Sequence, residues 1–140
     1  MYNISLIEKE NIYSIIPLLK ILNDTIDEAT LKSRLDEMIK AGYECVGVYE
    51  ADVLIGICGL WILTKYYVGK HMEPDNVIIH PHYRSKGIGN LMMEWIFKYA
   101  ESKGCVASEL NCYVFNEKGL KFWESQGYKV IGYHLQKKLS

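Results

Sequence analysis

The sequence predicts an α/β (α+β) fold, with one sheet that carries helices on its faces. The first observation is that the hydrophobic period changes repeatedly along the chain, in the order β, α, α, β, β, β, α, β, α, β. The second is size: 140 residues, 49% of them apolar, are enough for one sizeable core and too few for two independent ones. We therefore expect residues 1–140 to form a single domain without repeats or linkers.

The N-terminal part is predicted to contain one strand and two helices. Residues 2–7 alternate enough for a short strand. A helix follows, because isoleucine and leucine recur at helical spacing, and Pro17 makes its start uncertain. The second helix is indicated by the capping-box spacing of Thr25 and Glu28, by one apolar stripe, and by a stop at Gly42.

The middle of the chain has the two-residue period of strands. Residues 44–50 and 53–63 read as two strands joined across a short turn, and residues 66–72 and 76–80 extend the sheet. Pro74 cannot donate to a ladder, so it predicts a bulge or break between the last two pieces.

Two helices and two strands complete the chain. Apolar residues within 88–99 recur at helical spacing, which predicts a helix with one buried face. Residues 106–114 read as a buried strand. Asn116 is expected to cap a short helix that reaches about Ser125, and residues 128–139 are expected to form the last strand.

Composition argues against several classes of protein. No stretch approaches the roughly 18 unbroken apolar residues of a membrane span, and no signal-peptide pattern is present, so we expect a cytoplasmic location. Reduced cysteines packed as small hydrophobes are expected, because no C-x-x-C pair or metal-ligand spacing occurs. The cysteines are Cys45, Cys58, Cys105 and Cys112.

The net charge of −1 is unevenly divided along the chain. The acidic residues outnumber the basic ones in residues 1–83, and the reverse holds in residues 84–140. Two explanations of this charge division are equally good: chance distribution of surface charge, or a protein that holds an anion with one half and a cation with the other. Lysines of the basic half are dispersed, which argues against nucleic-acid binding.

An anion site is predicted where the chain leaves a buried strand and enters the helix near Gly87. Backbone N–H groups at a helix start have no intrahelical acceptor and lie at the positive end of the helix dipole. Gly87 and Gly89 let an anion approach, and Arg84 and Lys86 add positive charge. The turn is neither a dinucleotide fingerprint, because Met92 replaces the third glycine, nor a P-loop.

The R-x-x-G-x-G pattern of residues 84–89 resembles the acetyl-CoA pyrophosphate loop of the GNAT superfamily of N-acyltransferases. The sequence I-H-P-H-Y-R at residues 79–84 is similar to the family's strand exit, and residues 116–128 resemble its last helix at the Asn, the Phe and the Gly. The resemblance implies the GNAT fold, a mixed, mostly antiparallel sheet with helices on both faces. In that fold the fourth and fifth strands splay apart at a bulge.

The resemblance also implies a function. An N-acetyltransferase of this family moves an acetyl group from acetyl-CoA directly to a primary amine of a small molecule or peptide, without metal or disulfide. Tyr66, Tyr67, Glu73 and Asp75 suggest a cationic amine acceptor. Neither nucleic acid nor membrane is an expected partner, and a homodimer is allowed. The alternative is a GNAT-like acyl-CoA binding module with little or no turnover.

The family's cofactor contacts can be carried over by position. The backbone of Val77 and Ile79 would bond the pantetheine amides, with the thioester carbonyl near the Ile79 N–H, and Asn116 would bond the pantetheine from the other side. The backbone amides that would hold the pyrophosphate are those of Arg84, Ser85, Lys86, Gly87, Ile88, Gly89 and Asn90.

The catalytic groups are less well determined by the resemblance. Glu73 and Asp75, two apart on one face of a strand, are candidate bases for the attacking amine, and a pair of solvated charges explains them nearly as well. The family's general acid is a Tyr where this chain has Trp123, which can donate a hydrogen bond to the thioester sulfur but supplies no proton. Tyr113, Tyr128 or water could replace it, and Trp123 could instead pack against the cofactor or in the core.

Overall fold

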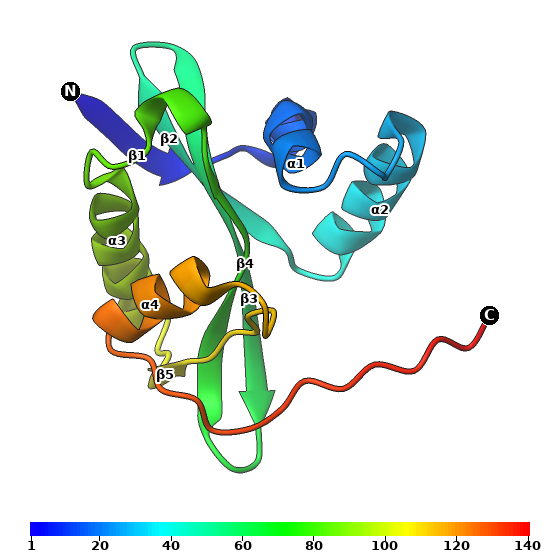
Figure 1. Cartoon of the computed structure of the whole chain (residues 1–140), viewed down its shortest axis with the longest axis vertical. Coiled ribbons are helices and arrows are strands. Elements are labelled where there is room, and N and C mark those ends of the chain that lie inside the picture. Colours follow the sequence, from blue (N-terminus) through cyan, green and yellow to red (C-terminus); the bar gives the residue numbers. More distant parts are fainter.

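A computed structural model describes all residues from Met1 to Ser140. Its sheet has five strands in the order β1-β2-β3-β4-β5, antiparallel except for the parallel β4–β5 pair (Figure 1). The strands are β1 (Tyr2–Leu6), β2 (Glu44–Glu50), β3 (Val53–Lys65), β4 (Gly69–Ile79) and β5 (Ala107–Ser108). The expected mixed, mostly antiparallel sheet is therefore confirmed.

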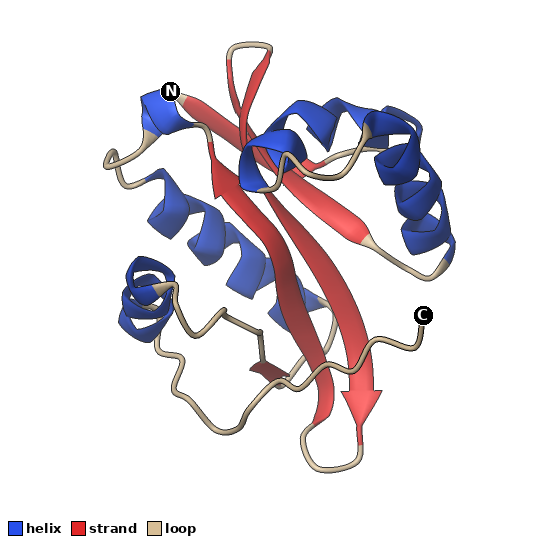
Figure 2. Cartoon of the chain, turned by 45° about the vertical axis from the view of Figure 1, so that its right-hand side comes forward, coloured by secondary structure: helices blue, strands red, loops and turns tan.

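Helices cover both faces of the sheet (Figure 2). One hydrophobic cluster contains Cys45 and Ile57 together with residues of the N-terminal helices, and the other contains Val46 and Cys58 with residues of the later helices. Because successive strand residues point to opposite faces, β2, β3 and β4 supply side chains to both clusters. The helices are α1 (Ile16–Leu22), α2 (Glu28–Lys40), α3 (Ile88–Ser102) and α4 (Glu117–Ser125), and a 3-10 segment, Lys9–Ile15, precedes α1. None of these helices has the length and apolar character needed to cross a bilayer.

The start of α2 differs from the predicted capping box. Asp27, not Thr25, is the N-cap, and its Oδ1 accepts a hydrogen bond from the Thr30 N–H at 2.7 Å. The Thr25 hydroxyl instead donates to the Asn23 side chain at 2.6 Å. The box spacing was wrong here because an aspartate nearer the helix satisfies the free N–H group first.

β4 is one strand and is not broken at Pro74, which pairs with Leu60 inside the β3–β4 ladder. The Met72 carbonyl accepts a hydrogen bond from the Glu109 N–H, so the backbone of Met72 faces β5. The nitrogen of Pro74, two residues further along, faces the same side. It lies beyond the last β4–β5 pair, where the sheet requires no donor from it. The predicted bulge exists further along, opposite Cys58, where Asn76 has φ 54°. The strand also begins at Gly69, not at residue 66, because residues 66–68 form the turn from β3.

The two C-terminal strands are shorter or absent. The strand predicted over residues 106–114 is reduced to β5, and residues 128–139 contain no strand. The tail runs past β5 to the C-terminus (Figure 1), and its apolar side chains are exposed, for example Tyr133 and Leu135. The local residue pattern predicted these strands, but a strand also needs a neighbour with which to exchange backbone hydrogen bonds.

Candidate active site

The turn between β4 and α3 presents a row of free backbone donors. The N–H groups from Ser85 to Asn90 have no backbone acceptor, and they lie at the start of the 15-residue helix α3. Ser85 and Gly87 both have left-handed backbone conformations, with φ 63° and φ 75°. Successive N–H groups at a helix N-terminus form a site suited to a phosphate group.

The two glycines of the turn have different surroundings. A Cβ at Gly87 would meet nothing within 4 Å, so an anion can approach the backbone there. A Cβ at Gly89 would lie 3.1 Å from the Phe122 ring, so this glycine allows α3 to pack closely on α4. The side chain of Arg84 donates to the Ile79 carbonyl at 3.1 Å, and Lys86 lies over the Tyr83 ring.

Beside this turn, the end of β4 has a free edge. The His80 N–H donates to the Ile55 carbonyl of β3, so the N–H and C=O of Ile79 point away from β3. The Ile79 carbonyl accepts from the Arg84 side chain, and the Ile79 N–H is left free. Val77 lies next to the bulge on the same strand. β5 pairs with β4 only through Ala107 and Ser108, and the chain then diverges from β4. The expected divergence of the fourth and fifth strands is therefore present.

The two candidate bases occupy different environments. The Glu73 Oε2 lies 2.8 Å from His71 Nε2 and 3.3 Å from Lys65 Nζ. The Asp75 Oδ2 accepts a hydrogen bond from the Trp61 indole at 3.1 Å. Both carboxylates therefore have side-chain partners and are not merely solvated charges on the strand.

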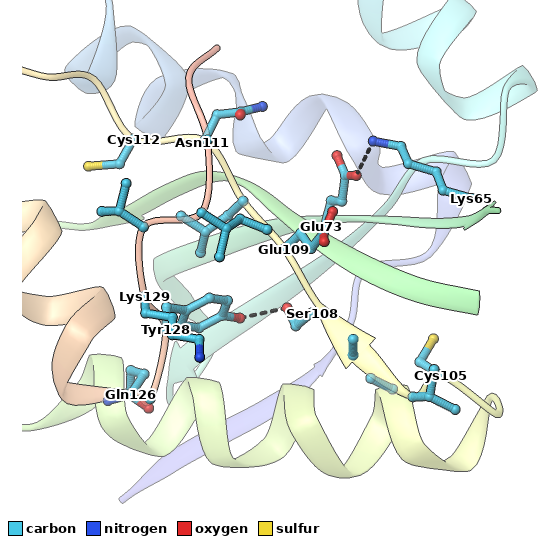
Figure 3. A pocket seen from close by; sticks show the side chains of 18 of the residues that line it. Lys65, Glu73, Cys105, Ser108, Glu109, Asn111, Cys112, Gln126, Tyr128 and Lys129 are labelled. Atoms are coloured by element: carbon cyan, nitrogen blue, oxygen red, sulfur yellow. Dashed lines mark hydrogen bonds and ion pairs between the residues drawn. The ribbon is translucent and has the colours of Figure 1, made fainter. Parts of the chain in front are cut away.

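A large cavity lies beside Glu73 (Figure 3). Its volume is about 1310 Å³, and its lining includes Tyr67, Glu109 and the tail residues from Lys129 to His134. Sequence reasoning missed His71 and Glu109. The two-residue strand period puts His71 on the face of Glu73, but Glu109 reaches this place only through β-pairing across distant residues.

The remaining predicted residues lie around α4. Asn116 caps this helix as predicted, with its Oδ1 accepting from the Gly119 N–H at 3.0 Å. Trp123 is buried at 8% exposure, and its ring centroid lies 5.4 Å from that of Tyr128 in an edge-to-face contact. Tyr113 is 76% exposed. The structure therefore places Trp123 in the core and Tyr113 at the surface.

Tyr128 joins α4 to β5. Its hydroxyl lies 2.6 Å from Ser108 Oγ (Figure 3). Burial raises the pKa of Tyr128 to about 12, and the contact with Ser108 lowers it in part. This residue is thus a neutral hydrogen-bonding group near neutral pH.

A mixed sheet with a diverging strand pair and a helix-start anion site beside it are the features that the resemblance to acyl-CoA-dependent acyltransferases led us to expect. The model of the acetyltransferase (GNAT) family matches residues 11–128, and the chain belongs to this family. The predicted family and enzyme class are therefore confirmed.

Relatives and solved structures agree with this membership. A probable glucosamine 6-phosphate N-acetyltransferase of Drosophila melanogaster is 28% identical over 111 residues, and these cover 76% of the chain and about half, 49%, of the relative. An uncharacterised N-acetyltransferase of Bacillus subtilis, YhdJ, is 22% identical over 86% of the chain and 87% of its own length. The structure of an aminoglycoside N-acetyltransferase in complex with CoA has a similar fold, with a TM-score of 0.85 at 15% identity over 99% of this chain and 94% of that one.

Proposed function

We propose that the protein is an N-acetyltransferase that moves an acetyl group from acetyl-CoA directly to a primary amine of a small molecule. The observation that carries the proposal is the run of free N–H donors from Ser85 to Asn90 beside the free edge of β4. The 140 residues act as one acetyltransferase domain in this proposal. The CoA bound to a structurally similar aminoglycoside acetyltransferase supports the choice of cofactor.

The cofactor lies along the free edge of β4. The loop amides from Ser85 to Asn90 hold the pyrophosphate, with charge from Arg84 and Lys86 at the rim; the Arg84 N–H itself donates to the Pro81 carbonyl. The outward backbone groups of Val77 and Ile79 bond the pantetheine, and Asn116 contacts it from α4. The Ile79 N–H stabilises the oxyanion that forms when the amine attacks the thioester.

Glu73 is the favoured base, because it lines the cavity, whereas Asp75 is held by the Trp61 indole. It takes the proton of the incoming ammonium group through a chain of waters, because Ile79 lies six residues further along β4, and the neutral nitrogen can then attack the carbonyl carbon. The departing thiolate takes a proton from Tyr113 or from water. Trp123 contributes by packing, since it is buried and its indole does not supply a proton.

The acceptor is a small amine in this proposal. Two similar proteins carry names that refer to amines on sugar rings, a glucosamine 6-phosphate and an aminoglycoside acetyltransferase. Two carboxylates in the cavity favour a cationic amine over a neutral one. A homodimer remains a prediction, and the exposed apolar side chains of residues 130–139 would support one.

The test separates the enzyme from an acyl-CoA binding module without turnover. Purified protein is titrated with CoA by calorimetry, and thiol release from acetyl-CoA is followed with a panel of amines, including glucosamine, kanamycin and putrescine. We expect CoA binding, amine-dependent thiol release, and loss of release in Glu73→Gln but not in the exposed control Glu124→Gln. CoA binding without release for any amine would support the binding module and contradict the proposal.

A further inference from the structure

The backbone of β4 changes phase between the two ends of the strand. The Met72 carbonyl accepts from the Glu109 N–H, so near this end the even-numbered residues turn their backbone groups away from β3. At the other end the His80 N–H donates to the Ile55 carbonyl, so Ile79 is the residue that turns away from β3. In an unbroken strand of period two these observations would exclude each other. One extra residue therefore lies between Met72 and Ile79.

The side chains of β4 show the same change of phase. Met72 belongs to the core cluster shared with the later helices, and Ile78 belongs to the cluster shared with the N-terminal helices. The two residues are six apart and would share a face in a regular strand. The register identifies the extra residue, because Asn76 and Val77 together lie opposite Cys58 of β3. This bulge turns the backbone groups that follow it towards the free edge, where the proposed cofactor lies.

Asn76 has the unusual backbone conformation of the bulge. Its φ of 54° lies in the left-handed region, which costs free energy for a residue with a Cβ and which asparagine tolerates better than most. Its Oδ1 accepts a hydrogen bond from the Tyr43 hydroxyl at 3.2 Å. Tyr43 directly precedes β2 and is completely buried, so its hydroxyl needs a partner, which Asn76 supplies. Burial also raises the pKa of Tyr43, so the hydroxyl keeps its proton and donates.

Two neighbours keep the Tyr43 ring beside the bulge. Gly59 pairs with Asp75 in the β3–β4 ladder, and a Cβ on Gly59 would overlap the Tyr43 ring and hydroxyl. The missing side chain of Gly59 therefore makes room for the phenol. The centroid of the Trp61 ring lies 5.2 Å from that of Tyr43, and its indole donates to Asp75 Oδ2 at 3.1 Å. Two aromatic donors in contact with each other thus hold two consecutive side chains of β4.

We propose that Tyr43 and Asn76 are positioning residues for CoA. The hydrogen bond from the phenol keeps Asn76 left-handed, and the resulting bulge presents the Ile79 N–H to the thioester and the Val77 backbone to the pantetheine. Both residues act through the backbone of β4 rather than by contact with CoA. The inference rests on the proposed function, because that function places the cofactor on this edge.

A purely structural role of the phenol is the alternative. Tyr43 belongs to the cluster shared with the N-terminal helices, and a phenylalanine ring would fill the same space. A residue needed only for packing would change the free energy of unfolding and leave the CoA affinity of the folded protein unchanged. The hydroxyl adds little to that packing, whereas it contacts the one left-handed residue of β4 other than glycine.

The first test compares two substitutions of Asn76 that differ by one Cβ. Asn76→Gly can keep the left-handed conformation without strain, whereas Asn76→Ala cannot. In calorimetric titrations we expect Asn76→Ala to bind CoA about 5- to 30-fold more weakly than Asn76→Gly, the ratio that corresponds to the strain of one left-handed residue. Thiol release from acetyl-CoA with glucosamine, kanamycin or putrescine should follow the same order.

Ala51→Gly is the matched control for this pair. Ala51 has φ 52° and lies in the turn between β2 and β3. Removal of its Cβ relieves the same kind of strain as the difference between the two Asn76 variants. The Tm of Ala51→Gly should change, and its CoA affinity should stay at the wild-type value.

Tyr43→Phe tests the hydrogen bond itself, because it keeps the ring and removes only the hydroxyl. We expect its Kd for CoA to be about 2- to 10-fold weaker, the effect of one hydrogen bond. In the Asn76→Gly background the same substitution should not change the Kd, because no side chain remains there for the hydroxyl to hold. A packing role would not produce this coupling. Tyr43→Phe also tests the inference if Asn76→Ala fails to fold.

The outcomes separate the inference from the proposed function. Equal CoA affinities in Asn76→Ala and Asn76→Gly would overturn the inference, and so would wild-type affinity in Tyr43→Phe. CoA binding without thiol release for any amine would contradict the proposed function alone, and the affinities of the variants would still decide the inference. A wild-type protein that does not bind CoA would contradict both.

Discussion

Replacing Gly87 by alanine should weaken CoA binding, because this position needs a left-handed backbone and an open approach. Gly87 has φ 75°, and a Cβ there would meet nothing within 4 Å. A residue with a Cβ loses roughly 1–2 kcal/mol in the left-handed conformation. If the turn relaxes to avoid this strain, CoA binding must restore the left-handed conformation. The same 1–2 kcal/mol then corresponds to about a 5- to 30-fold weaker Kd for CoA. The new methyl group also projects into the space through which the anion approaches.

Gly42→Ala is the matched control for this substitution. Gly42 has φ 104° and likewise nothing within 4 Å of an added Cβ, but it lies in the turn between α2 and β2. The Gly42→Ala variant should lose roughly 1–2 kcal/mol in its free energy of unfolding, measured in urea, which is the strain expected in Gly87→Ala. Its affinity for CoA should not change. Calorimetric titration of both variants with CoA provides the assay. Wild-type affinity in Gly87→Ala would remove this turn from the CoA site and refute the reasoning.

Three other substitutions or conditions test the rest of the site. Trp123→Tyr should lower the free energy of unfolding by about 1–2 kcal/mol, measured by urea denaturation, because a smaller ring leaves a gap in the core; unchanged stability would contradict the packing role. The folded-state pKa of Tyr128, about 12, lies above its ordinary value of 10.0, so its contribution to stability is full below pH 10 and is lost as pH rises towards 12. The free energy of unfolding should therefore fall less over that pH range in Tyr128→Phe than in the wild type. An equal fall in both proteins would exclude Tyr128 as its source. Treatment with EDTA or a mild reductant should leave acetyl transfer intact, because direct transfer needs neither metal nor disulfide; loss of activity would show otherwise.

The anion-binding turn could be predicted from the sequence because all of its donors are consecutive in the chain. The glycines, the basic residues and the following apolar helix lie within a few residues, and helix geometry then determines where the N–H groups of residues 85–90 point. The N-cap role of Asn116 was predictable for the same reason, since its partner is the N–H of Gly119. Local geometry therefore carries this part of the site.

The side-chain part of the site could not be predicted in the same way. Glu109 meets His71 only because β5 pairs with β4 in one register, and that register depends on packing of the whole sheet. The same limit explains the errors at the C-terminus. Residues 128–139 were expected to form the last strand, but no neighbouring strand is present to pair with them.

This division between backbone and side chains has a consequence for specificity. A cofactor held mainly by backbone amides places few demands on side chains, so chains of low sequence identity can share it, as the 22–28% identity of the relatives illustrates. The acceptor in our proposal is met by side chains, above all Glu73. Changing Glu73 should therefore lower acetyl transfer without altering CoA affinity, whereas changing Gly87 should weaken CoA binding. These two effects should add independently in a double variant, because the turn and Glu73 share no contact.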